Sequence, residues 1–158
     1  MKVIFLDIDG VLNSKRYDND RAAWTGNIDQ TRMVLLKRLV DRTGAEIILS
    51  SSWRIHWDVG EAQCDQRGLE MNRIFGAYGL KIAGKTPRIS FDRRADEIRE
   101  WLRTNEGLVE QFVILDDIPY AWDELSSHVV KTNYLIGRGL EDAHVEAAVA
   151  ILKTTMHD

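Results

Sequence analysis

The sequence has little cysteine, no long apolar run and no excess of positive charge, and each shortage excludes a class of protein. Cys64 is the only cysteine among 158 residues, so no disulfide can form within the chain, and a reducing compartment suits it. No apolar run approaches the roughly 20 residues that a membrane-spanning helix needs, and the first residues lead into an apolar segment instead of a signal peptide. We therefore expect a cytoplasmic protein that does not bind membranes.

The charge balance is slightly acidic, with 21 Lys and Arg residues against 25 Asp and Glu residues and a formal net charge of −4. A general nucleic-acid coat protein carries a clear basic excess, so this class is excluded, although a local basic groove is not. The sequence shows no internal repeat, linker or low-complexity segment. We expect one domain over residues 1–158, which is long enough to bury a hydrophobic core.

The segment at residues 2–13, KVIFLDIDGVLN, carries the most specific pattern in the chain. Its β-branched and aromatic start at residues 3–6 is typical of a central strand in a parallel sheet. Asp7 and Asp9 follow two residues apart, so they share one side of the chain at the strand end where α/β proteins bind ligands. Two crowded carboxylates repel each other unless a cation such as Mg²⁺ lies between them. Gly10 permits a sharp turn beside them.

Two further segments repeat the pattern of an apolar strand followed by polar residues. A strand at residues 45–49 precedes three serines, Trp53 and Arg54, and a strand at residues 111–115 precedes Asp116 and Asp117. Two adjacent aspartates after a buried strand are costly without a cation. Between these strands, a basic pair opens a helical pattern at residues 92–103.

Taken together, these segments resemble the four motifs of the haloacid dehalogenase (HAD) superfamily of phosphohydrolases, which use an aspartate as nucleophile. The sequence Ser-Ser-Ser-Trp-Arg at residues 50–54 is most similar to the small HAD domains of Swiss Army Knife RNA repair proteins. The resemblance covers essentially the whole chain. It implies a three-layer α/β, Rossmann-like fold with a central, mostly parallel sheet and with a minimal cap or none.

The resemblance also implies roles for the acidic residues. Asp7 is expected to attack phosphorus as the nucleophile, and Asp9 to act as general acid and then general base. Mg²⁺ is expected to be held by Asp7, the backbone carbonyl of Asp9 and Asp117. Asp116 is expected to bind the metal through water or to orient its neighbours.

Two further motif positions in this sequence each have more than one candidate. The hydroxyl that donates to a phosphoryl oxygen is expected from Ser51, which alignment on the following tryptophan favours, with Ser50 as the alternative. The basic residue that neutralises the phosphoryl group is expected to be Arg94, with Arg93 and Lys85 as alternatives.

The substrate is expected to be a phosphate monoester at an RNA or DNA end. Arg54, Lys85 and Arg88 would hold its phosphates, and a base would stack on Trp53 or Trp57. The residues expected to contact substrate are Gly10, Ser50, Ser52, Trp53, Arg54 and Lys85. A small nucleotide or sugar phosphate is the alternative substrate. A third hypothesis is a noncatalytic module that binds phosphorylated ends. Asp7 and Asp9 argue against it, because binding a phosphate requires no nucleophile.

The rest of the chain alternates between expected helices, strands and loops. A loop or small flap at residues 12–28 contains Trp24, which could shield the site or pack on the sheet. A helix capped by Asn27 or Asp29 ends at Gly44. The remaining expected elements are irregular helix at 58–78, a strand at 80–83, a turn at 84–87, a helix starting at Pro119, a strand at 128–132 and a helix from Glu141.

Overall fold

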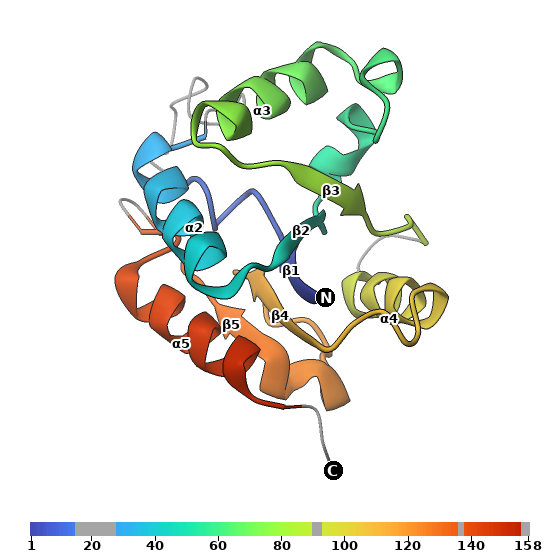
Figure 1. Ribbon diagram of the computed structural model, residues 1–158, viewed down its shortest axis with the longest axis vertical. Helices are drawn as coiled ribbons and strands as arrows, with labels where there is room; N and C mark the ends of the chain where they lie inside the picture. Colours follow the sequence, from blue (N-terminus) through green and yellow to red (C-terminus); the bar gives the residue numbers. More distant parts are fainter. Residues whose placement is uncertain (15–27, 90–92, 136–137, 156–158) are drawn as a thin grey trace.

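A computed structural model describes residues 1–14, 28–89, 93–135 and 138–155. Most of the expected loop, including Trp24 and Asn27, lies outside the described residues. The described chain forms a five-stranded sheet in the order β3-β2-β1-β4-β5, in which every strand pairing is parallel (Figure 1). The strands are β1 (Lys2–Leu6), β2 (Glu46–Leu49), β3 (Ile82–Lys85), β4 (Gln111–Asp116) and β5 (Val129–Lys131).

Helices and short helical turns connect these strands. The helices are α2 (Gln30–Thr43), α3 (Gln66–Ala77), α4 (Arg94–Thr104) and α5 (Asp142–Lys153), and the 3₁₀ helices are η1 (Ser52–His56), η2 (Glu61–Gln63) and η3 (Asp123–His128). The Asp29 side chain caps α2 by accepting a hydrogen bond from the Thr31 backbone. Gly44 ends α2 in the left-handed conformation, with φ of 68°, which glycine adopts without steric cost.

Alternating side chains divide the core between the two faces of the sheet. Ile4 and Leu6 belong to a core that includes buried residues of α2, α3 and α5. Val3 and Phe5 point to the other face, where they pack with Ala95 and other residues of α4. The sheet therefore lies between α2, α3 and α5 on one face and α4 on the other. These three layers confirm the expected α/β, Rossmann-like fold. In the described ranges, no element forms a separate cap domain.

Two local expectations were wrong. The third strand runs over Ile82–Lys85 instead of residues 80–83, because Gly84 and Lys85 pair with Ile48 and Leu49 of β2 and so extend the sheet into the expected turn. Pro119 starts no helix, and the next helical turn begins at Asp123. The side chain of Trp122 is buried in the core on the α4 face, and this packing keeps the segment after β4 against the sheet.

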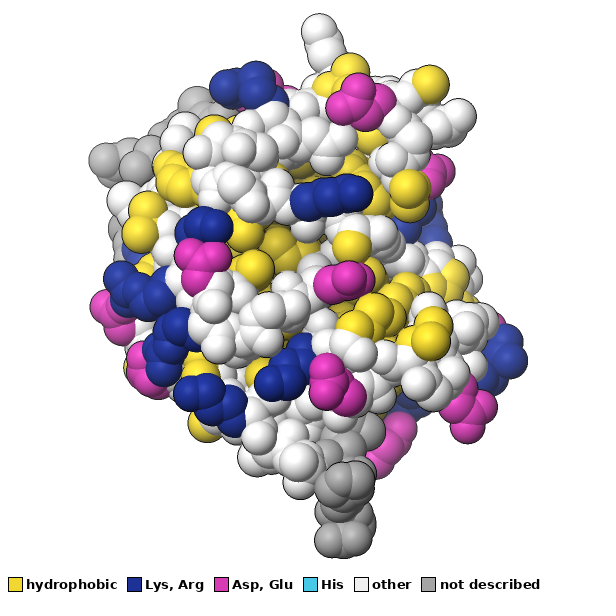
Figure 2. All heavy atoms as spheres, viewed as in Figure 1, with side chains coloured by type: hydrophobic (Ala, Val, Ile, Leu, Met, Phe, Trp, Pro, Cys, Tyr) yellow, Lys and Arg dark blue, Asp and Glu magenta, His cyan; other side chains and the backbone are white. Residues whose placement is uncertain are grey.

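Acidic and basic side chains are interspersed on the molecular face shown in Figure 2. Over α2 and α5, ion pairs link the two helices, with Arg38 lying 2.6 Å from Asp142 and Arg42 lying 2.5 Å from Glu146. The coloured residues on this face therefore form no continuous basic surface. Among the described helices, none has the length and apolar character needed to cross a membrane.

Candidate active site

Strand register places polar side chains together at the carboxyl edge of the central strands. Phe5 of β1 pairs with Ile48 of β2 and Ile114 of β4, and all three pack on the α4 face. The residues two positions further along these strands are Asp7, Ser50 and Asp116. Since side chains repeat every two residues along a strand, the apolar row toward α4 continues into a polar one.

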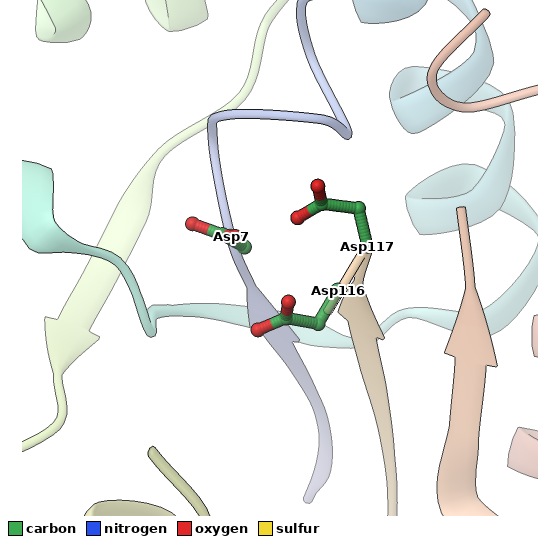
Figure 3. A group of neighbouring side chains, drawn as sticks. All are labelled: Asp7, Asp116 and Asp117. Atoms are coloured by element: carbon green, nitrogen blue, oxygen red, sulfur yellow. The ribbon is translucent and has the colours of Figure 1, made fainter. Parts of the chain in front are cut away.

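Three carboxylates gather at this edge. Asp7, Asp116 and Asp117 each offer an oxygen atom, and these oxygens all lie within 4.8 Å of one another. Figure 3 shows Asp7 at the end of β1 and the other two at the end of β4, with all three carboxylates extending to the same side. Such a set of oxygen atoms matches the ligand preference of Mg²⁺.

The crowding of these acids changes their protonation. Burial raises the pKa of Asp7 well above its usual range, and the neighbouring charge of Asp116 raises it further. Burial likewise raises the pKa of Asp116 to about 6 and raises the pKa of Asp117, although Arg94 opposes both shifts. In the metal-free protein these groups hold protons more readily than exposed aspartates do. Cation binding at this cluster is therefore expected to weaken as the pH falls toward 6.

The Asp9 carboxylate is not one of this group of three, and two donors hold it. Asn13 Nδ2 donates to one carboxylate oxygen at 3.0 Å, and Trp53 Nε1 donates to the other at 3.2 Å. The indole of Trp53 therefore bonds to the expected acid–base residue, a contact that joins η1 to the turn after β1. The backbone carbonyl of Asp9 stays a predicted metal ligand.

Gly10 is required by the close approach of Asp117. Its φ is 81°, and a Cβ atom built at this position would lie 2.3 Å from Asp117 Cγ. The Thr132 hydroxyl donates to the Gly10 carbonyl at 2.6 Å, which fixes the turn to the segment after β5. The absence of a side chain at Gly10 thus leaves room for Asp117 within the acidic cluster, a more specific requirement than the sharp turn that the sequence indicated.

Arg94, the first residue of α4, reaches into the same edge of the sheet. Its Nη1 donates to the Ser50 carbonyl at 2.5 Å and lies 3.3 Å from Asp116 Oδ2 and 3.5 Å from Asp7 Oδ1. Burial alone would lower the pKa of Arg94, but the carboxylates of Asp7 and Asp116 outweigh this effect and raise it. Arg94 is therefore a permanent positive charge beside the expected nucleophile. Arg93, an alternative candidate for the basic residue that neutralises the phosphoryl group, pairs with Asp96 instead.

The three serines lie in different surroundings. Ser50 is buried, and its hydroxyl has no hydrogen-bond partner among the described residues. Ser51 is also buried, and its hydroxyl oxygen accepts a hydrogen bond from the Trp53 backbone at 3.2 Å, which leaves its proton available for donation. Ser52 lines the cavity described next.

A cavity of about 520 Å³ opens beside the cluster. Its lining joins acids, several arginines and two tyrosines: Asp7, Asp9, Ser52, Arg54, Ile55, Arg88, Arg93, Arg94, Glu97, Asp117, Ile118, Tyr120 and Tyr134. A smaller cavity of about 230 Å³ shares Asp9 and Ser52 with it and includes Trp53, His56 and Arg67. The expected acid–base residue thus borders both spaces.

Comparison with known protein families supports this geometry. Residues 3–145 match the family described as the HAD domain in Swiss Army Knife RNA repair proteins. The chain belongs to this family. No curated protein and no solved structure matches the chain. HAD domains are generally hydrolases of the phosphatase type and typically use Mg²⁺, and the acidic group of this HAD domain is a possible metal site.

Lys85 and Trp57 of this HAD domain lie away from the acidic cluster. Lys85 Nζ donates to the carbonyls of Trp57 at 2.7 Å and Arg54 at 3.3 Å, and it does not line the large cavity. Trp57 is 3% exposed, and its indole N–H donates to Asn72 at 2.9 Å. The expectation that Trp57 could stack on a base was therefore wrong, because its ring is covered.

Glu97 is the buried residue that sequence reasoning missed. It forms an ion pair with Arg54, lies 3.7 Å from Arg94 and accepts a hydrogen bond from the Ile89 backbone at 2.9 Å. Glu97 follows Arg94 by three residues, which places both side chains on one side of α4. This spacing could have indicated from the sequence that Glu97 lies near the site. Nothing in the local sequence indicated the pairing with Arg54, because the two residues are 43 positions apart.

Proposed function

We propose that this protein is a Mg²⁺-dependent phosphatase that hydrolyses phosphate monoesters through an aspartyl-phosphate at Asp7. The observation that carries this proposal is the position of Asp7, whose carboxylate lies among two further carboxylates and 3.5 Å from Arg94. A nucleophile for phosphoryl transfer needs positive charge beside it, because the phosphoryl group is itself anionic. Membership of a HAD family supports the same chemistry.

The residues present fit a divalent cation. Asp7, Asp116 and Asp117 supply oxygen ligands on one side of the strand ends. Their pKa values are raised first by burial and then by the charges of neighbouring aspartates, and a bound cation would offset both effects. We propose that Asp7 and Asp117 hold Mg²⁺ together with the Asp9 carbonyl, and that Asp116 supports them. When bound, Mg²⁺ would draw negative charge from the phosphoryl oxygens.

The proposed reaction has two displacements at phosphorus. In the first, Asp7 Oδ attacks phosphorus and the ester oxygen leaves, taking a proton from Asp9. In the second, Asp9 accepts a proton from water, whose oxygen attacks the phosphorus of the aspartyl-phosphate and releases inorganic phosphate and free Asp7. Asn13 and Trp53 donate hydrogen bonds that hold Asp9 at the border of the cavity.

The remaining groups stabilise charge on the phosphoryl oxygens. We propose that Arg94 faces these oxygens from α4 and that Ser51 donates its hydroxyl proton from the end of β2. The link from Ser51 to the Trp53 backbone, and from the Trp53 indole to Asp9, supports this role for Ser51. Ser50, whose hydroxyl has no partner among the described residues, is the alternative.

We propose that the substrates are phosphorylated polynucleotide ends. The cavity beside Asp7 contains arginine and tyrosine side chains, which suit phosphates and bases respectively. The RNA repair context of the family supports such a substrate. We further propose that residues 1–158 act as one catalytic domain in the cytoplasm, where the single cysteine, Cys64, would stay reduced.

A panel of phosphate monoesters assayed with and without Mg²⁺ tests this function. We expect hydrolysis that depends on added Mg²⁺, falls to background after chelation and is fastest on oligonucleotides with a terminal phosphate. Mononucleotides that are cleaved far faster than oligonucleotides would replace the substrate class with small molecules. Tight binding of phosphorylated ends without turnover on any substrate would identify a binding module and refute the enzyme.

A further inference from the structure

Arg54 is a buried arginine in the wall of the large cavity whose hydrogen-bonding capacity is only partly used. It is 8% exposed, and two of its donors bond to the Ser51 carbonyl and to Glu97. Its Nε has no acceptor among the described residues. A guanidinium group carries five N–H donors, and buried donors are normally paired. Because Nε is itself buried, the donors left for another acceptor are the second N–H groups of Nη1 and Nη2.

Positive charge is in excess on this side of the cavity. Burial lowers the pKa of Arg54, the repulsion from Arg94 and Arg88 lowers it further, and Glu97 acts against this shift. Arg94 is already balanced by Asp7 and Asp116. Asp7 also acts against the lowering of the Arg54 pKa, though less than Glu97 does. No side-chain bond to an acid is found for Arg88 within the described residues.

Glu97 fixes the arrangement of these two arginines. Its carboxylate pairs with Arg54 and also accepts the backbone N–H of Ile89, which adjoins Arg88 in the chain. Glu97 is 2% exposed, so this bond is shielded from water and is stronger than an exposed one. One buried acid thus holds the segment with Arg88 beside Arg54, at the rim of the same cavity.

We propose that Arg54 and Arg88 form a second anion site, separate from the phosphoryl site at Asp7 and Arg94, that binds a phosphate group of the substrate. This inference rests on the proposed function and narrows its substrate class to monoesters that carry a second phosphate. A phosphodiester next to a terminal phosphate has this chemistry, and so does a small nucleoside bisphosphate. Paired guanidinium groups suit both, because a phosphate accepts several charge-assisted hydrogen bonds.

Binding to a variant without the nucleophile tests the second site independently of turnover. In Asp7→Asn protein, calorimetry would compare a nucleoside 3′-monophosphate, the corresponding 3′,5′-bisphosphate and a 3′-phosphorylated oligonucleotide. We expect the bisphosphate to bind about tenfold more tightly than the monophosphate, as a charge-assisted hydrogen bond would give. Adding Arg88→Ala should reduce this ratio to about twofold, and Arg88→Lys should retain part of it.

Arg103→Ala is the matched control, since Arg103 is an exposed arginine of α4 that pairs with Glu100 and does not line the cavity. It should leave the ratio unchanged. Equal affinities for the two nucleotides, or an equal loss for both in Arg88→Ala, would overturn the second site. Tighter binding of the oligonucleotide than of the bisphosphate identifies a polynucleotide end as the source of the second phosphate, and the reverse order identifies a small nucleotide. Absence of hydrolysis by the unaltered protein would refute the proposed phosphatase alone.

Discussion

The Asp7→Asn variant is expected to lose turnover by about 10⁴-fold or more, because an amide cannot attack phosphorus. The fold should be retained. Asn can keep the hydrogen bond that Asp7 Oδ1 accepts from the Ile8 backbone at 2.8 Å. Burial and the charge of Asp116 raise the pKa of the Asp7 carboxyl group, which means that its ionised form is unfavourable in the folded protein. The substitution removes this ionised group, so the metal-free variant should unfold at the same temperature or higher. Steady-state kinetics and thermal unfolding measure these two effects.

The matched control for this variant is Asp116→Asn. It removes one carboxylate from the same cluster and leaves the nucleophile in place, so we expect it to raise the Mg²⁺ concentration needed for activity while turnover persists at saturating Mg²⁺. This comparison separates loss of the nucleophile from weaker metal binding. Substantial phosphatase activity in a correctly folded Asp7→Asn protein would refute the role of Asp7.

Truncation of Arg94 to alanine is expected to reduce kcat/KM by about 10³-fold, the effect of removing a positive charge that acts on the transition state. The guanidinium group bonds to the Ser50 carbonyl and to Asp116 and lies 3.5 Å from Asp7. Its loss would leave these buried carboxylates without their nearest cation. The variant should also be less stable without Mg²⁺, because breaking a buried ion pair is costly.

Arg94→Lys keeps the charge and tests the same role if the alanine variant unfolds. A single ammonium group cannot reproduce the geometry of the guanidinium group, so activity should lie between those of the other two proteins. Arg103→Ala, at the far end of α4, should behave as the unaltered protein in both assays. Folded Arg94→Ala and Arg94→Lys proteins with kcat/KM within tenfold of the original would contradict the role of Arg94.

Much of the fold was predictable because its signals are local. The strands at residues 3–6 and 111–115 are short and buried on both sides, which is typical of a parallel sheet. Local sequence also narrowed the helix cap to Asn27 or Asp29, of which Asp29 is the cap, and predicted the helix end at Gly44. The convergence of Asp7 and Asp116 also follows from a general rule. Carboxyl ends of parallel strands meet at one edge, so residues that follow two adjacent strands must lie together.

The contacts that were not predictable join residues far apart in the chain. Lys85 is basic and near the site in sequence, but strand pairing at β3 turns its amine toward backbone carbonyls. Likewise, no sequence pattern indicated that the Trp53 indole bonds to Asp9 or that Arg54 pairs with Glu97. Residue type indicates what a side chain can bind. Which of several partners it meets depends on the tertiary structure, which brings η1 close to the turn after β1 and to α4.

The distribution of charge around the site could not be predicted from the amino-acid composition of the chain. The chain as a whole has a net charge of −4, but the cavity is lined by Arg54, Arg88 and Arg94, and the last of these lies beside a group of three carboxylates. In the unliganded protein the arginines and the carboxylates offset each other only in part, because burial still raises the pKa of Asp116 to about 6 and lowers the pKa of Arg54. A phosphorylated substrate together with a cation would neutralise both, which is the thermodynamic basis for proposing that they bind together.

The most direct test of Asp7 as the nucleophile is an acid quench during turnover of a monoester with a radiolabelled phosphoryl group, followed by peptide mapping. We expect label on a peptide that contains Asp7, and release of this label by hydroxylamine, which cleaves acyl phosphates but not phosphoserine. The label should be absent from the Asp7→Asn protein. Rapid hydrolysis with no labelled protein, or with label on any other residue, would contradict the assignment of Asp7 as the nucleophile.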